Sequence, residues 1–157
     1  GNTSDQLRKK YFQQLNNLFV AEPNKYDFKS MFKKEIISND IEMMIMLNQA
    51  AVFTKIMAYT PPNYSTDEIK QFVSEYEIKS NDGIGIVLIT EAFNRNLQKA
   101  TYHLVLVNMK TKEVLLQQKI VGNAQGVEFR NYWAASVYHV IKQVRSDYYK
   151  KWKKENK

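Results

Sequence analysis

The chain has 157 residues, enough for one domain with a buried core, and its hydrophobic (44%) and charged (25%) fractions are those of a globular fold. It contains no cysteine, which excludes disulfides, thiolate metal sites and cysteine nucleophiles, and no apolar run reaches the roughly 20 residues of a membrane-spanning helix. The net charge of +7 is uneven, because residues 142–157 hold seven cations against two acids.

The amino-terminal segment predicts short elements. Residues 1–15 are polar with scattered apolar positions, which indicates an arm or a short helix. The apolar run 18–20, followed by Pro23, predicts a brief strand. Asp27 is suited to cap a helix whose apolar residues recur at helical spacing as far as Ile36.

Two capping-box patterns predict the next helices. The first pairs Asn39 with Glu42, and its expected buried side is Ile41, Met44, Ile45 and Leu47. The second pairs Ser65 with Glu68 and precedes an amphipathic stripe of Ile69, Phe72, Val73 and Tyr76. Residues 50–60, between the two helices, fit helix or strand. Their β-branched and aromatic content favours a strand over 52–59.

Three predicted strands follow the turn at residues 81–83. The apolar run 84–89 predicts a central strand buried on both faces. Polar turns at 94–96 and 110–112 then lead into strands 102–107 and 114–121. Because loops this short cannot cross over to a parallel partner, we expect an antiparallel meander.

The last predicted element is a long helix. Its apolar stripe is Trp133, Val137, Val140, Ile141, Val144 and Tyr148, and the residues off this stripe are Ser136, His139, Gln143 and Ser146. We expect the stripe to lie across the sheet and the basic tail 150–157 to be solvated. The predicted fold class is α+β, one domain over 1–157. Its sheet is antiparallel, with a mixed order left open, and its helices pack on the sheet.

Most candidate chemistry has a structural explanation. Gly83 and Gly85 precede a strand rather than a helix, which argues against a nucleotide-binding loop. His103 and His139 have no third ligand at a suitable spacing, so we expect neither a metal nor a cofactor. Several acids lie near strand ends: Glu91, Glu113 and Glu128. A carbohydrate or peptide hydrolase with Glu91 or Glu128 as acid or base is therefore an alternative.

The densest cluster of potential ligand-binding residues is Arg130, Asn131, Tyr132 and Trp133, at a loop that enters the last helix. Asn131 could cap that helix, and the free amides of its first turn could bind an anion together with Arg130. The two rings could stack on a sugar or a base. The structural alternative is that Trp133 begins the buried stripe and Phe129 packs at the helix entry.

Three stretches of the second half resemble a family of uncharacterised exported proteins of gut anaerobes. They are residues 83–87, residues 108–115 and residues 129–134, which read GIGIV, NMKTKEVL and FRNYWA. The order of elements is also similar to the amino-terminal domain of TolB and to curli-secretion lipoproteins. The resemblance implies an exported α/β-sandwich without an assigned activity, and it supplies no catalytic residues.

The expected function is an exported, non-enzymatic binding or scaffolding domain of the cell envelope, periplasmic or lipid-anchored. The opening Gly1-Asn2-Thr3-Ser4 fits a chain from which a signal peptide has been removed. The expected partner is an envelope protein or a small ligand. A third function is binding of an anionic membrane or nucleic acid through the Lys-rich tail. Nucleic acid is not the expected partner, because the rest of the chain is nearly neutral.

Overall fold

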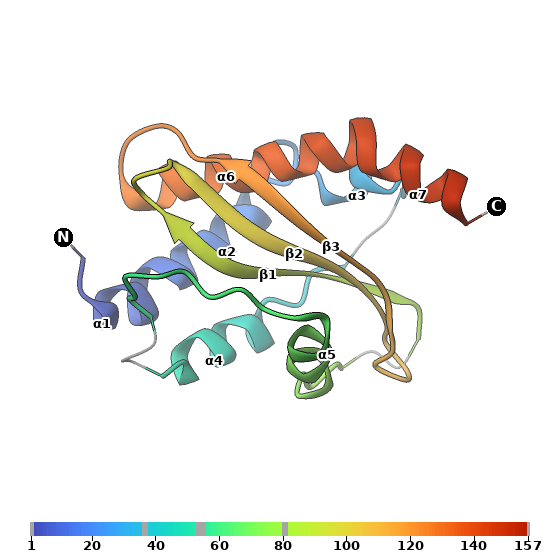
Figure 1. The fold of residues 1–157 in the computed structure, drawn as a ribbon, viewed down its shortest axis with the longest axis horizontal. Coiled ribbons are helices and arrows are strands. Elements are labelled where there is room, and N and C mark those ends of the chain that lie inside the picture. The colour runs from blue at the N-terminus through green and yellow to red at the C-terminus, as the bar shows by residue number, and fades with distance from the viewer. Residues whose placement is uncertain (1, 36–37, 53–55, 80–81, 157) are drawn as a thin grey trace. The chain divides into compact units, whose positions relative to one another are not determined.

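Figure 1 shows the chain in a computed structural model, which describes residues 2–35, 38–52, 56–79 and 82–156. The chain divides into two compact units. The helical unit comprises Gly1–Met57 and Gly122–Lys157, and the sheet unit comprises Ala58–Val121. A three-stranded antiparallel sheet and a long C-terminal helix confirm the predicted α+β class. The single domain over 1–157 and the packing of the closing helix across the sheet stay predictions.

The three strands form the predicted meander. They are β1 (Ile84–Asn94), β2 (Lys99–Asn108) and β3 (Val114–Asn123), in the order β1-β2-β3. β1 and β2 pair antiparallel from Ile84 opposite Asn108 to Asn94 opposite Lys99. The prediction that 84–89 is the central strand is wrong. β1 lies at an edge with half-buried side chains, and β2 is central, with Leu104 and Val105 fully buried. The apolar run therefore fixed neither burial nor the number of strand neighbours, since Ile84 is exposed and residues 85–89 are half-buried.

Helix α5 (Thr66–Ser74) belongs to the sheet unit and confirms its predicted capping box. The Ser65 hydroxyl accepts a hydrogen bond from the Glu68 amide at 3.2 Å, and the Glu68 carboxylate accepts one from the Ser65 amide at 2.8 Å. Ile69 and Val73 are fully buried on one side of the helix. Lys112, in the turn between β2 and β3, donates to the carbonyl of Ser74 and holds the end of α5.

The helical unit begins with an unbroken helical stretch. It consists of α1 (Ser4–Gln6), the π-helical turn η1 (Leu7–Tyr11) and α2 (Phe12–Ala21). The strand predicted at 18–20 is therefore wrong. Leu15 and Leu18 are both buried, three residues apart on one helix face, and a run of three apolar residues is too short to override that spacing.

Two short helices follow in the helical unit. α3 (Phe28–Met31) confirms Asp27 as its cap, since the Asp27 carboxylate accepts from the Ser30 amide at 3.2 Å. It ends before the predicted limit at Ile36, a residue outside the described ranges. Phe32 forms the C-cap, and Lys33 has a φ of 52°, which stops the helix.

The second of these helices, α4 (Glu42–Ala50), starts later than predicted. Its N-cap is Ile41, so the expected capping box of Asn39 with Glu42 is wrong. This helix lies wholly within the described residues and has no buried position. Of the four residues predicted on its buried side, Leu47 is exposed and the others, Ile41, Met44 and Ile45, are half-buried. Residues 52 and 56–59 are not in a strand, and residues 53–55 of the predicted strand lie outside the described ranges.

The C-terminal helical stretch is continuous from Phe129 to Glu155. It consists of α6 (Phe129–Gln143), the π-helical turn η3 (Val144–Tyr148) and α7 (Tyr149–Glu155), and α6 contacts α2 and α3. The predicted stripe is buried from Trp133 to Val144. Ser136, predicted to lie off the stripe, is fully buried, and its hydroxyl donates to the Trp133 carbonyl at 2.6 Å. The apolar pattern of the helix cannot predict this burial, because Gly122 packs against the backbone of Ser136.

The end of the chain is helical rather than a loose tail. Trp152 is only 8% exposed, and its ring stacks on Phe32 and on Tyr148 at centroid distances of 6.1 and 5.6 Å. The prediction that 150–157 is a solvated tail therefore holds for the exposed lysines and is wrong for Trp152. Among the described residues, no helix combines the length and the apolarity needed to cross a bilayer.

Candidate functional site

The most connected group of polar side chains lies in the sheet unit and centres on Glu91. The pairing of β1 with β2 shifts register between Thr90 and Ala92, so Glu91 has no opposite residue in the ladder. Such a β-bulge turns a side chain away from its regular direction. Here it brings the Glu91 carboxylate to His103, the residue that faces Ile89 on β2.

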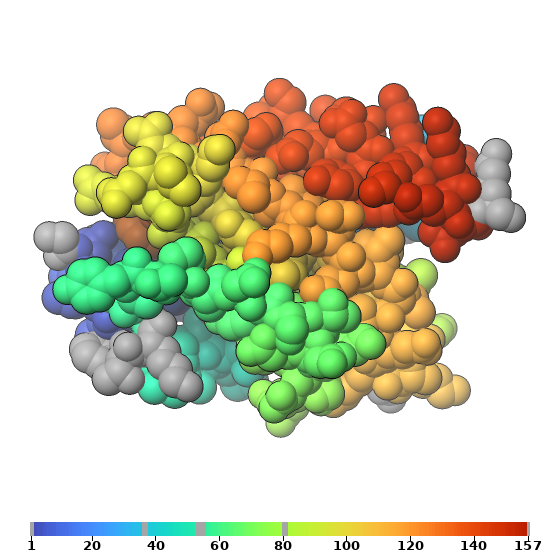
Figure 2. All heavy atoms as spheres, in the orientation of Figure 1, coloured from blue at the N-terminus to red at the C-terminus, as the bar shows by residue number. Residues whose placement is uncertain are grey.

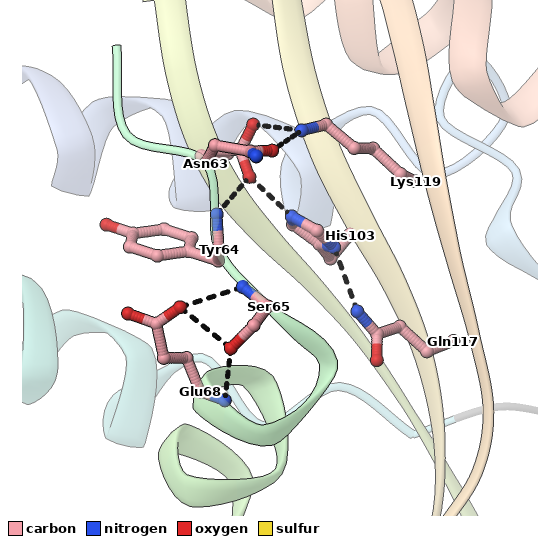
Figure 3. A network of polar contacts seen from close by, with 8 residues as sticks. Asn63, Tyr64, Ser65, Glu68, His103, Gln117 and Lys119 are labelled. Atoms are coloured by element: carbon pink, nitrogen blue, oxygen red, sulfur yellow. Dashed lines mark hydrogen bonds and ion pairs between the residues drawn. The ribbon is translucent and has the colours of Figure 1, made fainter.

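Both carboxylate oxygens of Glu91 are occupied. Oε2 lies 2.7 Å from Nε2 of His103 and accepts a hydrogen bond from the Tyr64 amide at 2.9 Å. Oε1 forms an ion pair with Nζ of Lys119 at 2.6 Å. The side chains of Glu91 and His103 are 4% and 2% exposed, whereas that of Lys119 is 42% exposed. In Figure 3 the side chains of His103 and Lys119 point toward the carboxylate that they bind.

Residues of β3 and of the segment before α5 complete this network. Gln117 and Lys119 are two residues apart on β3 and so point to the same face of the sheet. The Gln117 side-chain amide lies 3.1 Å from Nδ1 of His103, and Lys119 also donates to the Asn63 side chain at 2.9 Å. The ring of Tyr64 lies against His103 at a centroid distance of 6.3 Å. The network therefore joins all three strands to the segment before α5.

The hydrogen bonds assign the proton positions on His103. An ionised carboxylate only accepts, so Nε2 of His103 carries the proton in its bond with Glu91. In the neutral ring Nδ1 then accepts from the nitrogen of Gln117. The other atom of that amide, Oε1 of Gln117, is buried without a hydrogen-bond partner among the described residues.

The environment keeps Glu91 ionised. Burial raises its pKa, but the hydrogen bonds from His103, Lys119 and the Tyr64 amide, with the charge of Lys119, outweigh burial and lower the pKa below its usual range. A general acid needs the opposite shift. Glu91 is therefore poorly suited to donate the proton in the hydrolase alternative.

The lowered pKa of Glu91 makes the stability of the protein depend on acid pH. The stabilisation is complete above the ordinary glutamate pKa of 4.5 and is lost as the pH falls through the lower folded pKa. We expect Glu91→Gln to remove this part of the pH dependence. Urea unfolding between pH 6 and pH 3 gives the free energy of unfolding at each pH. If this free energy falls with pH equally in the two proteins, Glu91 does not contribute.

The predicted ligand-binding residues lie on the first turn of α6, in the helical unit. Arg130 and Asn131 are exposed, and the guanidinium Nε of Arg130 donates to the Asn131 side chain at 3.2 Å. Tyr132 is half-buried and packs edge-on against Trp133, a residue that is 5% exposed. The helix begins at Phe129 with Glu128 as N-cap, so the expected cap by Asn131 is wrong.

The other candidates are dispersed. Glu128 is exposed and belongs to a different unit from Glu91, and Glu113 is exposed in the turn before β3. His139 accepts a hydrogen bond from the Asn123 amide at 2.9 Å, which makes it structural. Within the described part of the chain, no three His, Asp or Glu side chains are grouped so that they could hold a metal ion.

Comparison with protein-family models, with curated proteins and with solved structures found no match to this chain. The resemblance to exported proteins of gut anaerobes therefore stays a prediction from the sequence.

Proposed function

We propose that this chain is a non-enzymatic binding or scaffolding domain of the cell envelope. The observation that carries the proposal is the burial and hydrogen bonding of Glu91 and His103. Among the described residues, these two come closest to a catalytic pair. A catalytic acid, base or nucleophile must reach its substrate. Both side chains are almost fully buried, and each is held by partners within the sheet unit. Their hydrogen bonds therefore stabilise the fold.

The binding surface that we propose is the first turn of α6. The first amides of a helix have no acceptor within it and lie at the positive end of its dipole, so they suit a carboxylate or another anionic group. Arg130 adds a positive charge at this point, and Asn131 and Tyr132 add hydrogen-bonding groups. Trp133 supports the turn from below, because its ring packs against Phe129 and Tyr132.

Site-directed photo-crosslinking in the native cell tests this surface. Val127 is 79% exposed and lies three residues before Arg130, so a photoreactive residue at position 127 would capture a bound partner. We expect a crosslinked product in the periplasmic or membrane fraction. Arg130→Ala should reduce that product about tenfold or more and leave the circular dichroism spectrum unchanged, because Arg130 is exposed.

The matched control places the same photoreactive residue at Leu97, which is 65% exposed in the turn between β1 and β2. It should give no product that depends on Arg130. Equal crosslinking from both positions would remove the α6 surface from the proposal, and recovery of the protein in the cytosol would overturn the envelope location.

A further inference from the structure

The last helix displays an unusual density of positive charge. α7 spans seven residues, of which four are lysines, Lys150, Lys151, Lys153 and Lys154, and all four are exposed. Its acid, Glu155, makes a loose ion pair with Lys151 at 3.9 Å, in which both side chains are more than half exposed. α7 therefore carries a net positive charge at its surface, part of the red region in Figure 2.

The aromatic residues that alternate with these lysines face inward. Trp152 stacks on Phe32 and Tyr148, and the ring of Tyr149 meets the edge of Phe32 and lies under Nζ of Lys33 at 5.7 Å. These rings attach α7 to the helical unit, so the lysines stand on a fixed helix end. Trp152 is buried and Tyr149 is half-buried, so neither ring stands fully exposed for stacking on bases or for insertion into a bilayer.

This arrangement discriminates between anionic partners. Proteins that bind single-stranded nucleic acid combine a basic groove with exposed aromatic rings on which the bases stack. A membrane surface of anionic lipids attracts each nearby Lys or Arg without stacking. Lysines on long flexible side chains can reach a plane from several directions around a helix end.

We propose that Lys150, Lys151, Lys153 and Lys154 hold this domain against the surface of an anionic lipid bilayer. The inference rests on the proposed envelope location, and it adds the surface on which the domain lies. A basic patch gives weak binding by itself and becomes effective beside a second attachment to the membrane. The lysine patch thereby orients the helical unit toward the lipid headgroups.

Vesicle co-sedimentation of the purified chain tests the patch. The vesicles are phosphatidylcholine with or without 30 mol% phosphatidylglycerol (about one anionic lipid in three), at low and high salt. We expect binding to the anionic vesicles that falls with salt. Replacement of all four lysines by Gln should lower the partition coefficient on the order of a hundredfold. Gln keeps the helix propensity, whereas truncation would also remove the buried Trp152.

Two further variants keep the test decisive. Lys→Arg at the same four positions should retain binding. Lys→Gln at four other exposed positions, Lys29, Lys70, Lys99 and Lys110, removes the same net charge and should lower binding far less. An equal loss in both Gln variants, or no anionic-vesicle binding by the wild-type chain, would overturn the patch. Tighter binding to a 20-base single-stranded DNA than to the anionic vesicles at the same salt concentration would reassign it to nucleic acid. The vesicle assay uses purified protein and so tests the lysine patch alone. The envelope location is tested separately, by where the protein is recovered from the cell.

Discussion

Gly122→Ala should destabilise the protein by about 3 kcal/mol or more, the cost of forcing a side chain into a closely packed backbone contact. An ideal Cβ on Gly122 would lie 2.1 Å from the Ser136 carbonyl oxygen and 2.8 Å from the carbonyl carbon of the same residue. Those atoms belong to α6 and cannot rotate away. The next residue, Asn123, donates its amide to His139, so a shift of this segment also breaks that bond.

Urea unfolding measures the effect, and Gly85→Ala is the matched control. A Cβ on Gly85 would meet the flexible side chain of Met109 at 3.3 Å, which can move. We expect the control to cost less than about 1 kcal/mol. A Gly122→Ala protein as stable as the control would show that Gly122 does not lie as close to the Ser136 carbonyl as described.

Glu91→Ala is expected to cost roughly 2–4 kcal/mol, because it leaves the buried His103 and the Tyr64 amide without an acceptor. Most of this loss comes from His103, which is 2% exposed. Lys119 contributes little, since its half-exposed ammonium can be solvated by water. The small cavity left by the carboxylate adds to the loss.

The matched control for Glu91→Ala is Glu68→Ala. Glu68 also accepts hydrogen bonds from a backbone amide and from a side chain, but it is exposed at the start of α5. We expect a clearly smaller loss there, because water can replace the exposed carboxylate as the hydrogen-bond acceptor. Equal losses for the two variants would mean that the buried network adds nothing beyond ordinary surface hydrogen bonds.

The predictable parts of the fold are those that local chemistry determines. Ser65 and Glu68 form their capping box from neighbouring residues alone, and the two short turns between the strands force the antiparallel meander. The prediction of a strand at 18–20 is wrong because it considers three residues only. The helix that buries Leu15 and Leu18 is ten residues long. The burial of Ser136 depends on Gly122, which is fourteen residues away in the sequence and carries no local signal for it.

The candidate site was predictable only in fragments. Glu91 was recognised as an acid near a strand end and His103 as an isolated histidine, but nothing in the sequence marks the bulge that joins them. Gln117 and Lys119 are recognisable as a pair on one strand face, yet their contact with His103 and Glu91 depends on the register of β3. The approach of Tyr64 from the loop before α5 has no sequence signature.

We propose that the Glu91 network maintains the fold and takes no part in binding or catalysis. The most direct test combines two measurements on Glu91→Ala, urea unfolding and crosslinking from position 127 at a temperature where the variant is still folded. We expect a large loss of stability with crosslinking unchanged. A fully folded, stable variant that no longer captures its partner would instead place Glu91 in the functional site.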